Sequence, residues 1–363
     1  MPKWFRTFLV PMALLALVAA ACGEEDGDVP PANGDEVECN ADLNVGVAYD
    51  VGGRGDKSFN DAATAGVTAA VDEGLVCEEN VTYIEPDATG SNRDENVLAL
   101  AEDGNELVVA VGFAFSEGIN ETAGDFPDTH FAIIDGFATC GTVCGLANDD
   151  LTNVTDLTFK EHEGSFLVGA VAAIQAGKDG CDTVGFLGGQ TGPLIEKFEA
   201  GYIAGVAHID ESIEVLSEYI GPDVTAFNDA VRGEALSTDM YDAGACIIYH
   251  AAGASGAGLF NAAVEADQLA IGVDSDQYLL VSPEQQPHIL TSMLKRVDTA
   301  AHDAIQQEGD GTIEPGAQVF GMEEGGVDYS KSNTDLMTED ITSEVDELKQ
   351  MIIDGEITVP ETP

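Results

Sequence analysis

The chain has 363 residues, of which 67 are acidic and 13 are basic, and its formal net charge at pH 7 is −54. This charge excludes nucleic acid as a partner, because no basic stripe is present to neutralise phosphates. The hydrophobic fraction of 44% also excludes a disordered acidic chain, so we expect a folded protein whose acidic residues are spread over its helices.

The first residues have the pattern of a signal peptide. Lys3 and Arg6 precede an apolar run over residues 8–21, which is too short for a membrane-spanning helix and ends in small residues. We therefore expect residues 1–21 to be removed and the mature protein to be exported.

Cys22 follows three alanines, a pattern that resembles a bacterial lipobox. We expect Cys22 to be lipidated and to anchor the protein to the outer face of the cell membrane. Ala19 stands where the lipobox usually has Leu, so ordinary signal cleavage that leaves Cys22 unmodified is the alternative. Residues 22–38 are rich in Asp, Glu, Gly and Pro, and they predict an acidic tether behind the anchor.

Short apolar strands alternate with helical patterns along the rest of the chain. This alternation predicts right-handed βαβ units and parallel sheets, and it restarts after a break. The first series comprises strands at 43–49, 81–84, 107–111 and 130–135 and helices at 61–75, 92–102 and from Ser116. The second comprises helices at 164–176, 193–208, 255–267 and 297–307 and strands at 183–187, 214–219, 245–249, 269–273 and 289–294, followed by a strand near 317–320 and a helix at 340–354.

Two series of this length do not fit into one sheet. We therefore predict an α/β fold of two doubly wound parallel-sheet lobes with a cleft between them. Lobe I is expected to comprise residues 39–138 and 275–308, and lobe II residues 139–274 and 309–363. In such sheets ligands bind beyond the carboxyl ends of the strands, so we expect binding residues at the strand ends.

The end of the first predicted strand carries a group of polar and aromatic residues. Asp50 ends the strand, and Ser58 followed by Asp61 fits a capping box at the start of the next helix. Asp50, Phe59 and Asn60 would then face the cleft, where a carboxylate, a ring and an amide can recognise a planar heterocycle. The alternative is that Asp50 and Asn60 only satisfy turn backbone and that Phe59 belongs to the core.

Two charged residues end strands of the second series. Asp274 follows the strand at 269–273, and a carboxylate there can accept hydrogen bonds from two vicinal sugar hydroxyls. Lys295 ends the strand at 289–294 and is expected to orient Asp274; a solvated surface lysine is the alternative. The glycine run at 253–258 matches neither a dinucleotide nor a phosphate motif, so we interpret it as a turn that offers backbone N–H groups.

Several ordered motifs resemble those of the basic membrane protein family, the purine-nucleoside receptor lipoproteins of ABC importers. The likeness extends over most of the chain beyond the tether and implies the fold of a type I periplasmic binding protein. The motifs are DVGGRGDKSFN at 50–60, FKEHEGSFLVG at 159–169, GFLGGQTGPLIEKFEAGY at 185–202, GVDSDQ at 272–277, LTSMLKRVD at 290–298 and MIIDGEITVP at 351–360.

The resemblance implies a role for each matching position. Two rings would sandwich the base, groups near strand ends of the first series would bind its edge, and charged groups at later strand ends would hold the ribose hydroxyls. The implied residues are Phe59 and Phe198 for the rings, Asp50, Asn60 and Asp135 for the edge, and Asp274, Lys295 and the backbone near Gly253 for the ribose.

Six cysteines remain after Cys22, and an even number in an exported protein predicts disulfides. Six cysteines allow 15 pairings. Free or buried thiols are the alternative. No CxxC motif is present, so we expect neither redox nor metal chemistry. The pairs we favour are Cys39–Cys77, Cys140–Cys144 and Cys181–Cys246.

These observations favour a monomeric solute receptor that closes over a nucleoside and delivers it to an ABC importer permease. Closure would use hinge segments near 136–150 and 274–290. The first alternative is the same fold tuned to another sugar-like or planar solute. A nucleoside hydrolase is the second, but neither HExxH nor GxSxG occurs, so we expect no enzyme, no cofactor and no metal.

The charge predicts a stability that depends on salt. Repulsion among the acidic residues opposes the compact state, and dissolved salt screens it. We expect the free energy of unfolding, measured by denaturant titration, to increase from low to molar sodium chloride. A free energy that stays constant or falls over this range would contradict this prediction.

Overall fold

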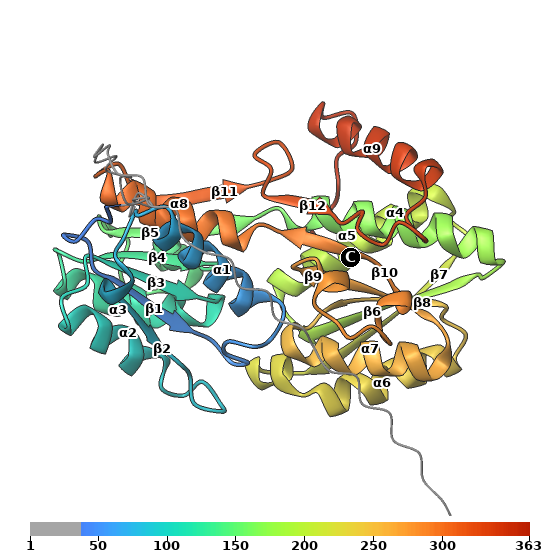
Figure 1. Ribbon diagram of the computed structural model, residues 1–363, viewed down its shortest axis with the longest axis horizontal. Coiled ribbons are helices and arrows are strands. Elements are labelled where there is room, and N and C mark those ends of the chain that lie inside the picture. Colours follow the sequence, from blue (N-terminus) through green and yellow to red (C-terminus); the bar gives the residue numbers. More distant parts are fainter. Residues whose placement is uncertain (1–37) are drawn as a thin grey trace, which may run out of the picture. The chain divides into compact units, whose positions relative to one another are not determined.

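A computed structural model describes residues 38–363 (Figure 1). The expected signal peptide, most of the tether and Cys22 lie outside the described residues. None of the described helices is long and apolar enough to cross a membrane.

The first sheet has six parallel strands in the order β11-β5-β4-β3-β1-β2. We call this sheet and its helices lobe I. Its strands are β1 (Val45–Tyr49), β2 (Val81–Ile84), β3 (Leu107–Val111), β4 (His130–Ile134), β5 (Val154–Phe159) and β11 (Gly316–Phe320), and its helices are α1 (Phe59–Asp72), α2 (Arg93–Glu102), α3 (Ser116–Thr122) and α8 (Val297–Gly309).

Alternate residues of the central strands face opposite layers of helices. In β3, Val109 packs in the cluster that contains α1 and α8, whereas Val108 packs with α2 and α3. Gly46 in β1 allows α2 to approach closely, because a Cβ there would lie 2.8 Å from a methyl carbon of Leu100. Burial on both faces explains why these strands are continuously apolar in the sequence.

The second sheet also has six strands, in the order β12-β10-β9-β8-β6-β7, and only β12 is antiparallel. We call it, with its helices, lobe II. Its strands are β6 (Thr183–Gln190), β7 (Glu214–Gly221), β8 (Ile247–Ala251), β9 (Leu269–Asp274), β10 (Ile289–Lys295) and β12 (Val327–Tyr329), and its helices are α4 (Glu161–Asp179), α5 (Pro193–Ile209), α6 (Ala230–Asp242), α7 (Gly256–Ala266) and α9 (Glu339–Ile353).

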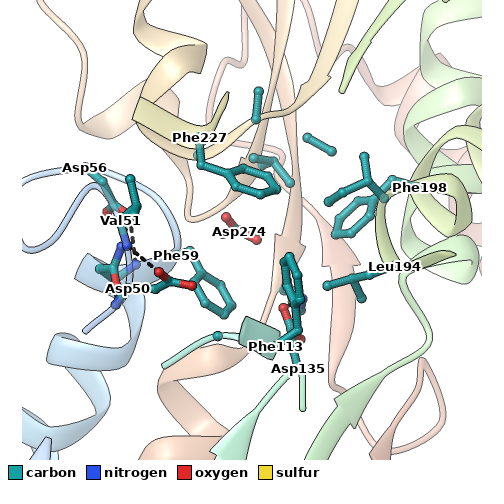
Figure 2. Close-up of a pocket in the computed structure, with 18 residues that line it drawn as sticks. Asp50, Val51, Asp56, Phe59, Phe113, Asp135, Leu194, Phe198, Phe227 and Asp274 are labelled. Carbon is teal, nitrogen blue, oxygen red and sulfur yellow. Dashed lines mark hydrogen bonds and ion pairs between the residues drawn. The ribbon is translucent and has the colours of Figure 1, made fainter. Parts of the chain in front are cut away.

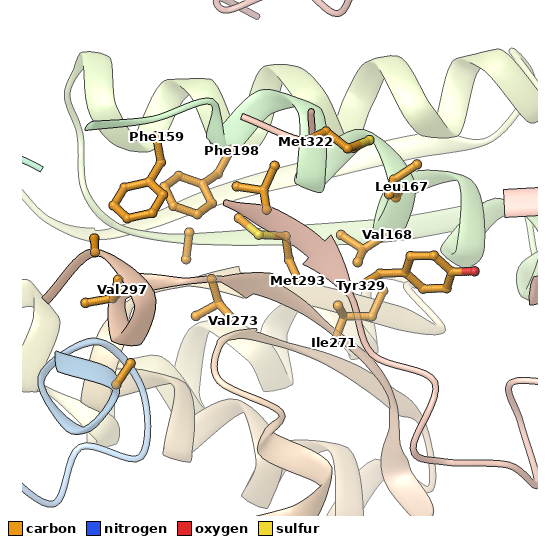
Figure 3. Packing of buried hydrophobic residues seen from close by; sticks show 14 of the residues in the cluster. Phe159, Leu167, Val168, Phe198, Ile271, Val273, Met293, Val297, Met322 and Tyr329 are labelled. Carbon is orange, nitrogen blue, oxygen red and sulfur yellow. The ribbon is translucent and has the colours of Figure 1, made fainter. Parts of the chain in front are cut away.

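Glycines allow α4 and α5 to pack closely on one face of the second sheet. A Cβ on Gly169 would lie 2.3 Å from the carbonyl oxygen of Tyr202, and one on Gly205 would lie 2.0 Å from that of Phe166. Figure 3 shows the apolar layer between these helices and the sheet. Any larger residue at either glycine would push the helices apart.

The chain crosses between the two sheets three times. The crossings lie at Lys160, between β5 and α4, at Arg296, between β10 and α8, and at residues 321–326, between β11 and β12. Backbone hydrogen bonds tie the three together: Lys160 N donates to Phe320 O at 3.1 Å, and Arg296 N donates to Gly326 O at 2.9 Å.

The sheet order corrects the expected lobe boundaries. Strand β5 lies in the first sheet although residues 139–274 were assigned to lobe II, and β10 lies in the second although residues 275–308 were assigned to lobe I. Strand β11 returns to the first sheet. The expected hinges near 136–150 and 274–290 are therefore wrong, because the chain stays within one lobe at both. Strand pairing over long sequence separations, which periodicity does not report, decides these positions.

Other elements were missed. The sequence pattern did not predict β5, α6 or β12. Helix α4 also begins earlier than expected, at Glu161. Polar residues interrupt β5, so it lacks the apolar run by which strands were assigned. Polar residues also interrupt α6, so it lacks a clear apolar helical pattern.

Three disulfides link the cysteine pairs that the sequence favoured. The Cα–Cα distances are 5.0 Å for Cys39–Cys77, 5.7 Å for Cys140–Cys144 and 6.5 Å for Cys181–Cys246. The last pair joins the segments that enter the neighbouring strands β6 and β8. It therefore closes a long loop within lobe II.

Removing this long-range disulfide should destabilise the protein. Replacing Cys181 and Cys246 by serine frees a loop with a sequence separation of 65 residues. We expect the free energy of unfolding to fall by about 4 kcal/mol, from the entropy of loop closure. The matched control replaces Cys140 and Cys144, which are only 4 residues apart, and should cost less than half as much. Equal losses in denaturant titrations would contradict the loop argument.

Candidate ligand-binding site

One pocket lies where the carboxyl ends of both sheets meet (Figure 2). The space among its lining atoms is about 610 Å³, and part of this space is open to solvent. Its walls carry all eight binding residues expected from the sequence. The lining residues are Asp50, Val51, Asp56, Phe59, Asn60, Gly112, Phe113, Asp135, Leu194, Ile195, Phe198, Phe227, Ala251, Ala252, Gly253, Val273, Asp274 and Lys295.

The expected residues reach the pocket from the ends of strands and the starts of helices. Lobe I provides Asp50 after β1, Phe59 and Asn60 at the start of α1, and Asp135 after β4. Lobe II provides the others. They are Phe198 in α5, Gly253 after β8, Asp274 at the end of β9 and Lys295 at the end of β10.

Four aromatic rings line the pocket, and two of them were missed. Phe113 follows β3, and Phe227 lies in the short helix η5 (Val224–Asn228). Their ring centroids are 6.3 Å apart with an interplanar angle of 71°, so an edge-to-face contact joins the two lobes. The position of Phe113 just after the strand at 107–111 was a signal that the strand-end rule could have used.

Lys295 lies at the centre of this junction and is 2% exposed. Its Nζ donates to Oδ2 of Asp135 at 2.5 Å and lies 3.3 Å from Oε1 of Glu161. Burial by itself would lower the pKa of Lys295, but the carboxylates of Asp135, Glu161 and Asp274 raise it to about 12. The ammonium also lies about 5 Å from the centroids of three rings, those of Phe59, Phe159 and Phe198.

Glu161 was not among the binding residues expected from the sequence. It begins α4 at the first crossing, is fully buried, and has Nζ of Lys197 at 3.6 Å on its other side. Neither of its carboxylate oxygens accepts a hydrogen bond within residues 38–363. Burial raises the pKa of Glu161, and Lys295 and Lys197 oppose this shift.

Asp274 is not ion-paired with Lys295 as expected; its Oδ2 instead accepts a 2.5 Å hydrogen bond from Oγ of Ser58 in lobe I. Burial raises the pKa of Asp274 to about 7, against the charge of Lys295 and the Ser58 hydrogen bond. The backbone of Asp274 is in the left-handed region, with φ of 63°. Its carboxylate thus lies in the pocket between the two lobes.

The expected capping box at Ser58 is wrong. The Ser58 side chain makes no cap hydrogen bond to α1, because it reaches across to Asp274. Asp56 caps the helix instead, accepting from the backbone N–H groups of Ser58, Asn60 and Asp61 at 2.9 to 3.1 Å. Burial raises the pKa of Asp56, and these hydrogen bonds oppose the shift.

Asp50 and Asn60 line the pocket and also support the turn before α1. Arg93 donates to Oδ1 of Asp50 through Nε and Nη2. Asn60 Oδ1 accepts from the backbone N–H of Asp50 at 3.3 Å, and its Nδ2 donates to Asp56 at 2.9 Å. Burial raises the pKa of Asp50, and Arg93 opposes the shift. Asp50 and Asn60 therefore line the pocket and satisfy turn backbone at the same time, so the two expectations for them are compatible.

The raised pKa of Asp274 predicts a pH-dependent stability. Between the usual carboxyl pKa near 4 and the folded-state value of about 7, the folded protein binds more protons at this site than the unfolded chain does. The contribution of Asp274 to stability therefore falls as pH rises through this window. We expect the free energy of unfolding of the unchanged chain, minus that of Asp274→Asn, to decrease by up to about 1.4 kcal/mol per pH unit. A difference that is flat from pH 4 to 7 in denaturant titrations would contradict this.

Comparison with known proteins identifies the family. Residues 43–363 match the family profile described as Bmp, ABC transporter substrate-binding protein PnrA-like. The chain is 31% identical to the ABC transporter nucleoside-binding protein BmpA of Lactococcus lactis, covering 98% of this chain and 99% of that one. It is also 31% identical to basic membrane protein A of Borreliella burgdorferi, over 84% of each chain.

A solved ABC transporter solute-binding protein from Aeropyrum pernix has the same fold. It superposes with a TM-score of 0.74 at 28% identity, covering 88% of this chain and 94% of that one. This agrees with the two parallel-sheet lobes that the sequence predicted. The chain belongs to the Bmp family of PnrA-like ABC transporter substrate-binding proteins.

Proposed function

We propose that this substrate-binding protein captures a nucleoside by lobe closure and delivers it to the permease of an ABC importer. The observation that carries this proposal is the composition of the pocket that Asp274 and Lys295 line at the junction of the lobes. Phe59 comes from lobe I and Phe198 from lobe II, and Figure 2 places both rings at the same pocket as Asp274. Rings and a carboxylate suit a ligand with a planar part and hydroxyl groups.

The charges of the pocket favour an uncharged nucleoside over a nucleotide. Four carboxylates line it, and they belong to Asp50, Asp56, Asp135 and Asp274. The single lining cation, Lys295, is already paired with Asp135 and Glu161. A phosphate would therefore meet negative charge without a free cation to neutralise it.

Closure would bend the three crossings at Lys160, Arg296 and residues 321–326. These segments are short, lie side by side through backbone hydrogen bonds, and are the covalent links between the lobes. Bending there moves each sheet as a rigid body and buries the ligand. Two stacking contacts and several charge-assisted hydrogen bonds support micromolar or tighter binding, about −8 kcal/mol.

The relatives support the ligand class and the location. The Lactococcus lactis relative is named a nucleoside-binding protein, and relatives from Pyrococcus abyssi and Pyrococcus horikoshii are named lipoproteins. We propose that this chain is likewise extracytoplasmic, monomeric and anchored through lipidated Cys22.

A second candidate ligand is another sugar-like solute. Asp274 and Lys295 alone could hold vicinal hydroxyls, so a sugar without a base could still make part of the proposed contacts. We propose no catalytic role. Incubation with nucleosides, followed by analysis for released base, distinguishes a receptor from a hydrolase.

The test is a calorimetric panel of nucleosides, free bases and sugars in molar salt. We expect nucleosides to bind most tightly and Asp274→Ala to weaken binding by about 2–4 kcal/mol, because it leaves buried ligand hydroxyls without an acceptor. Asp267→Ala is the matched control, since Asp267 also has a left-handed φ, 53°, but is exposed. Tight binding of a sugar but of no nucleoside would refute the proposed ligand, and an unchanged dissociation constant would refute the role of Asp274.

A further inference from the structure

We propose that Gln277 is a positioning residue that holds the lobes closed without touching the ligand. The inference rests on the proposed closure over a solute. It concerns five residues that we call the interlobe latch: Lys57 and Ser58 of lobe I, and Asp274, Ser275 and Gln277 of lobe II. Gln277 begins the short helix η7 (Gln277–Leu279) after β9 and is absent from the pocket wall.

Three hydrogen bonds cross between the lobes within the latch. Nε2 of Gln277 donates to the backbone oxygen of Lys57 at 3.0 Å. Oγ of Ser275 donates to the backbone oxygen of Ser58 at 3.4 Å. Oγ of Ser58 donates back to Asp274 at 2.5 Å. Only the last involves a residue that lines the pocket, so Gln277 can contribute to closure independently of ligand contacts.

The amide of Gln277 is held in one orientation. Its Oε1 accepts from the backbone N–H of Val273 at 2.9 Å and contacts Nε2 of His250 at 2.9 Å. Burial lowers the pKa of His250 to about 4, so the ring is neutral near pH 7. Because Val273 N can only donate, the oxygen of Gln277 must lie on this side and its NH₂ group must face lobe I. The backbone N–H of Gln277 is bound as well, to Oγ of Ser292 at 3.1 Å.

Both ends of the latch have unusual backbone. Lys57 and Asp274 adopt left-handed φ values of 55° and 63°, which residues other than glycine rarely do. Such conformations persist where surrounding contacts hold them, and they gather at functional sites. In lobe I the carbonyl of Lys57 receives the Gln277 amide, and in lobe II Asp274 receives Ser58. Two of the three latch bonds thus end on a residue with left-handed backbone.

These bonds form only when the lobes are together. The latch therefore stabilises the closed state relative to any open one, and a ligand must break it to leave. Since Gln277 does not line the pocket, its loss should change the affinity for every ligand by the same factor. The effect should lie in the dissociation rate, because the encounter with the open form does not involve the latch.

The test compares Gln277→Met with Gln286→Met in stopped-flow measurements on several nucleosides. Methionine keeps the length of the side chain but removes the amide. Gln286 is a matched control in the same loop, since its amide donates to Tyr278 within lobe II. We expect Gln277→Met to dissociate about 10-fold faster, the effect of one hydrogen bond, with association within about twofold. Gln286→Met should behave as the unchanged chain.

A second variant separates positioning from a purely structural role. Gln277→Glu keeps an acceptor for Val273 and His250 but has a donor for Lys57 only when the introduced carboxyl is protonated. The ratio of its dissociation rate to that of the unchanged chain should therefore approach one as pH is lowered. A pH-independent ratio, or an unchanged rate in Gln277→Met, would overturn the proposal. So would ratios that differ among ligands by more than about threefold, since they indicate direct contact.

Failure of the proposed function has a different signature. If the unchanged chain binds no nucleoside, that proposal fails, and the latch is then judged by small-angle scattering without ligand. Gln277→Met should have a larger radius of gyration than the unchanged chain and Gln286→Met. Equal radii would overturn the latch.

Discussion

The closed arrangement depends on the ion pairs that the buried ammonium of Lys295 makes with Asp135 and Glu161. A charge that is removed from water is stable only with paired and hydrogen-bonded partners. Those partners come from both sides of the junction, since Asp135 ends a strand of lobe I and Glu161 begins the helix that leads into lobe II. Separating the lobes would pull Asp135 away from Lys295. The ion pair therefore links the hinge, the binding pocket and the closed state in one place.

Basic residues are few in this chain, and those near the pocket are paired with carboxylates. Among the basic residues that the structure describes, three lie at or beside the pocket, and each is paired with a buried carboxylate. Arg93 holds Asp50, Lys197 lies beside Glu161, and Lys295 holds Asp135. The remaining pocket carboxylates, Asp56 and Asp274, are held by backbone N–H groups and by Ser58 instead. Each lining carboxylate is thus held through at least one oxygen, while Oδ1 of Asp135 accepts no hydrogen bond within residues 38–363. An acidic lining of this kind suits neutral ligands that bring hydroxyl and N–H donors.

In the proposed function, the two lobes divide the work of recognition. Lobe I offers a rigid turn in which Asp56 caps α1 and thereby orients Phe59 and Asn60. Lobe II offers Phe198 and Asp274 from a helix and a strand that are packed into its core. Because the backbone that carries each set is fixed within its own lobe, the proposed closure would bring together two largely preformed halves of a site. The hydrogen bond from Gln277 to Lys57 would then add to the closed state without involving a residue of the pocket lining.

Local pattern was enough to predict two parallel-sheet lobes, because a doubly buried strand must be continuously apolar and a crossover helix must follow it. The same logic placed Asp50, Asp274 and Lys295 at strand ends and Phe59 at the start of a helix, and likeness to a family added Phe198. Sheet membership of β5 and β10, the burial of Glu161, the ring of Phe227 and the bond between Ser58 and Asp274 were decided only in three dimensions. Ser58 and Asp274 are 216 residues apart. Contacts of that kind depend on how the chain crosses between the sheets, and no periodicity along the sequence carries that information.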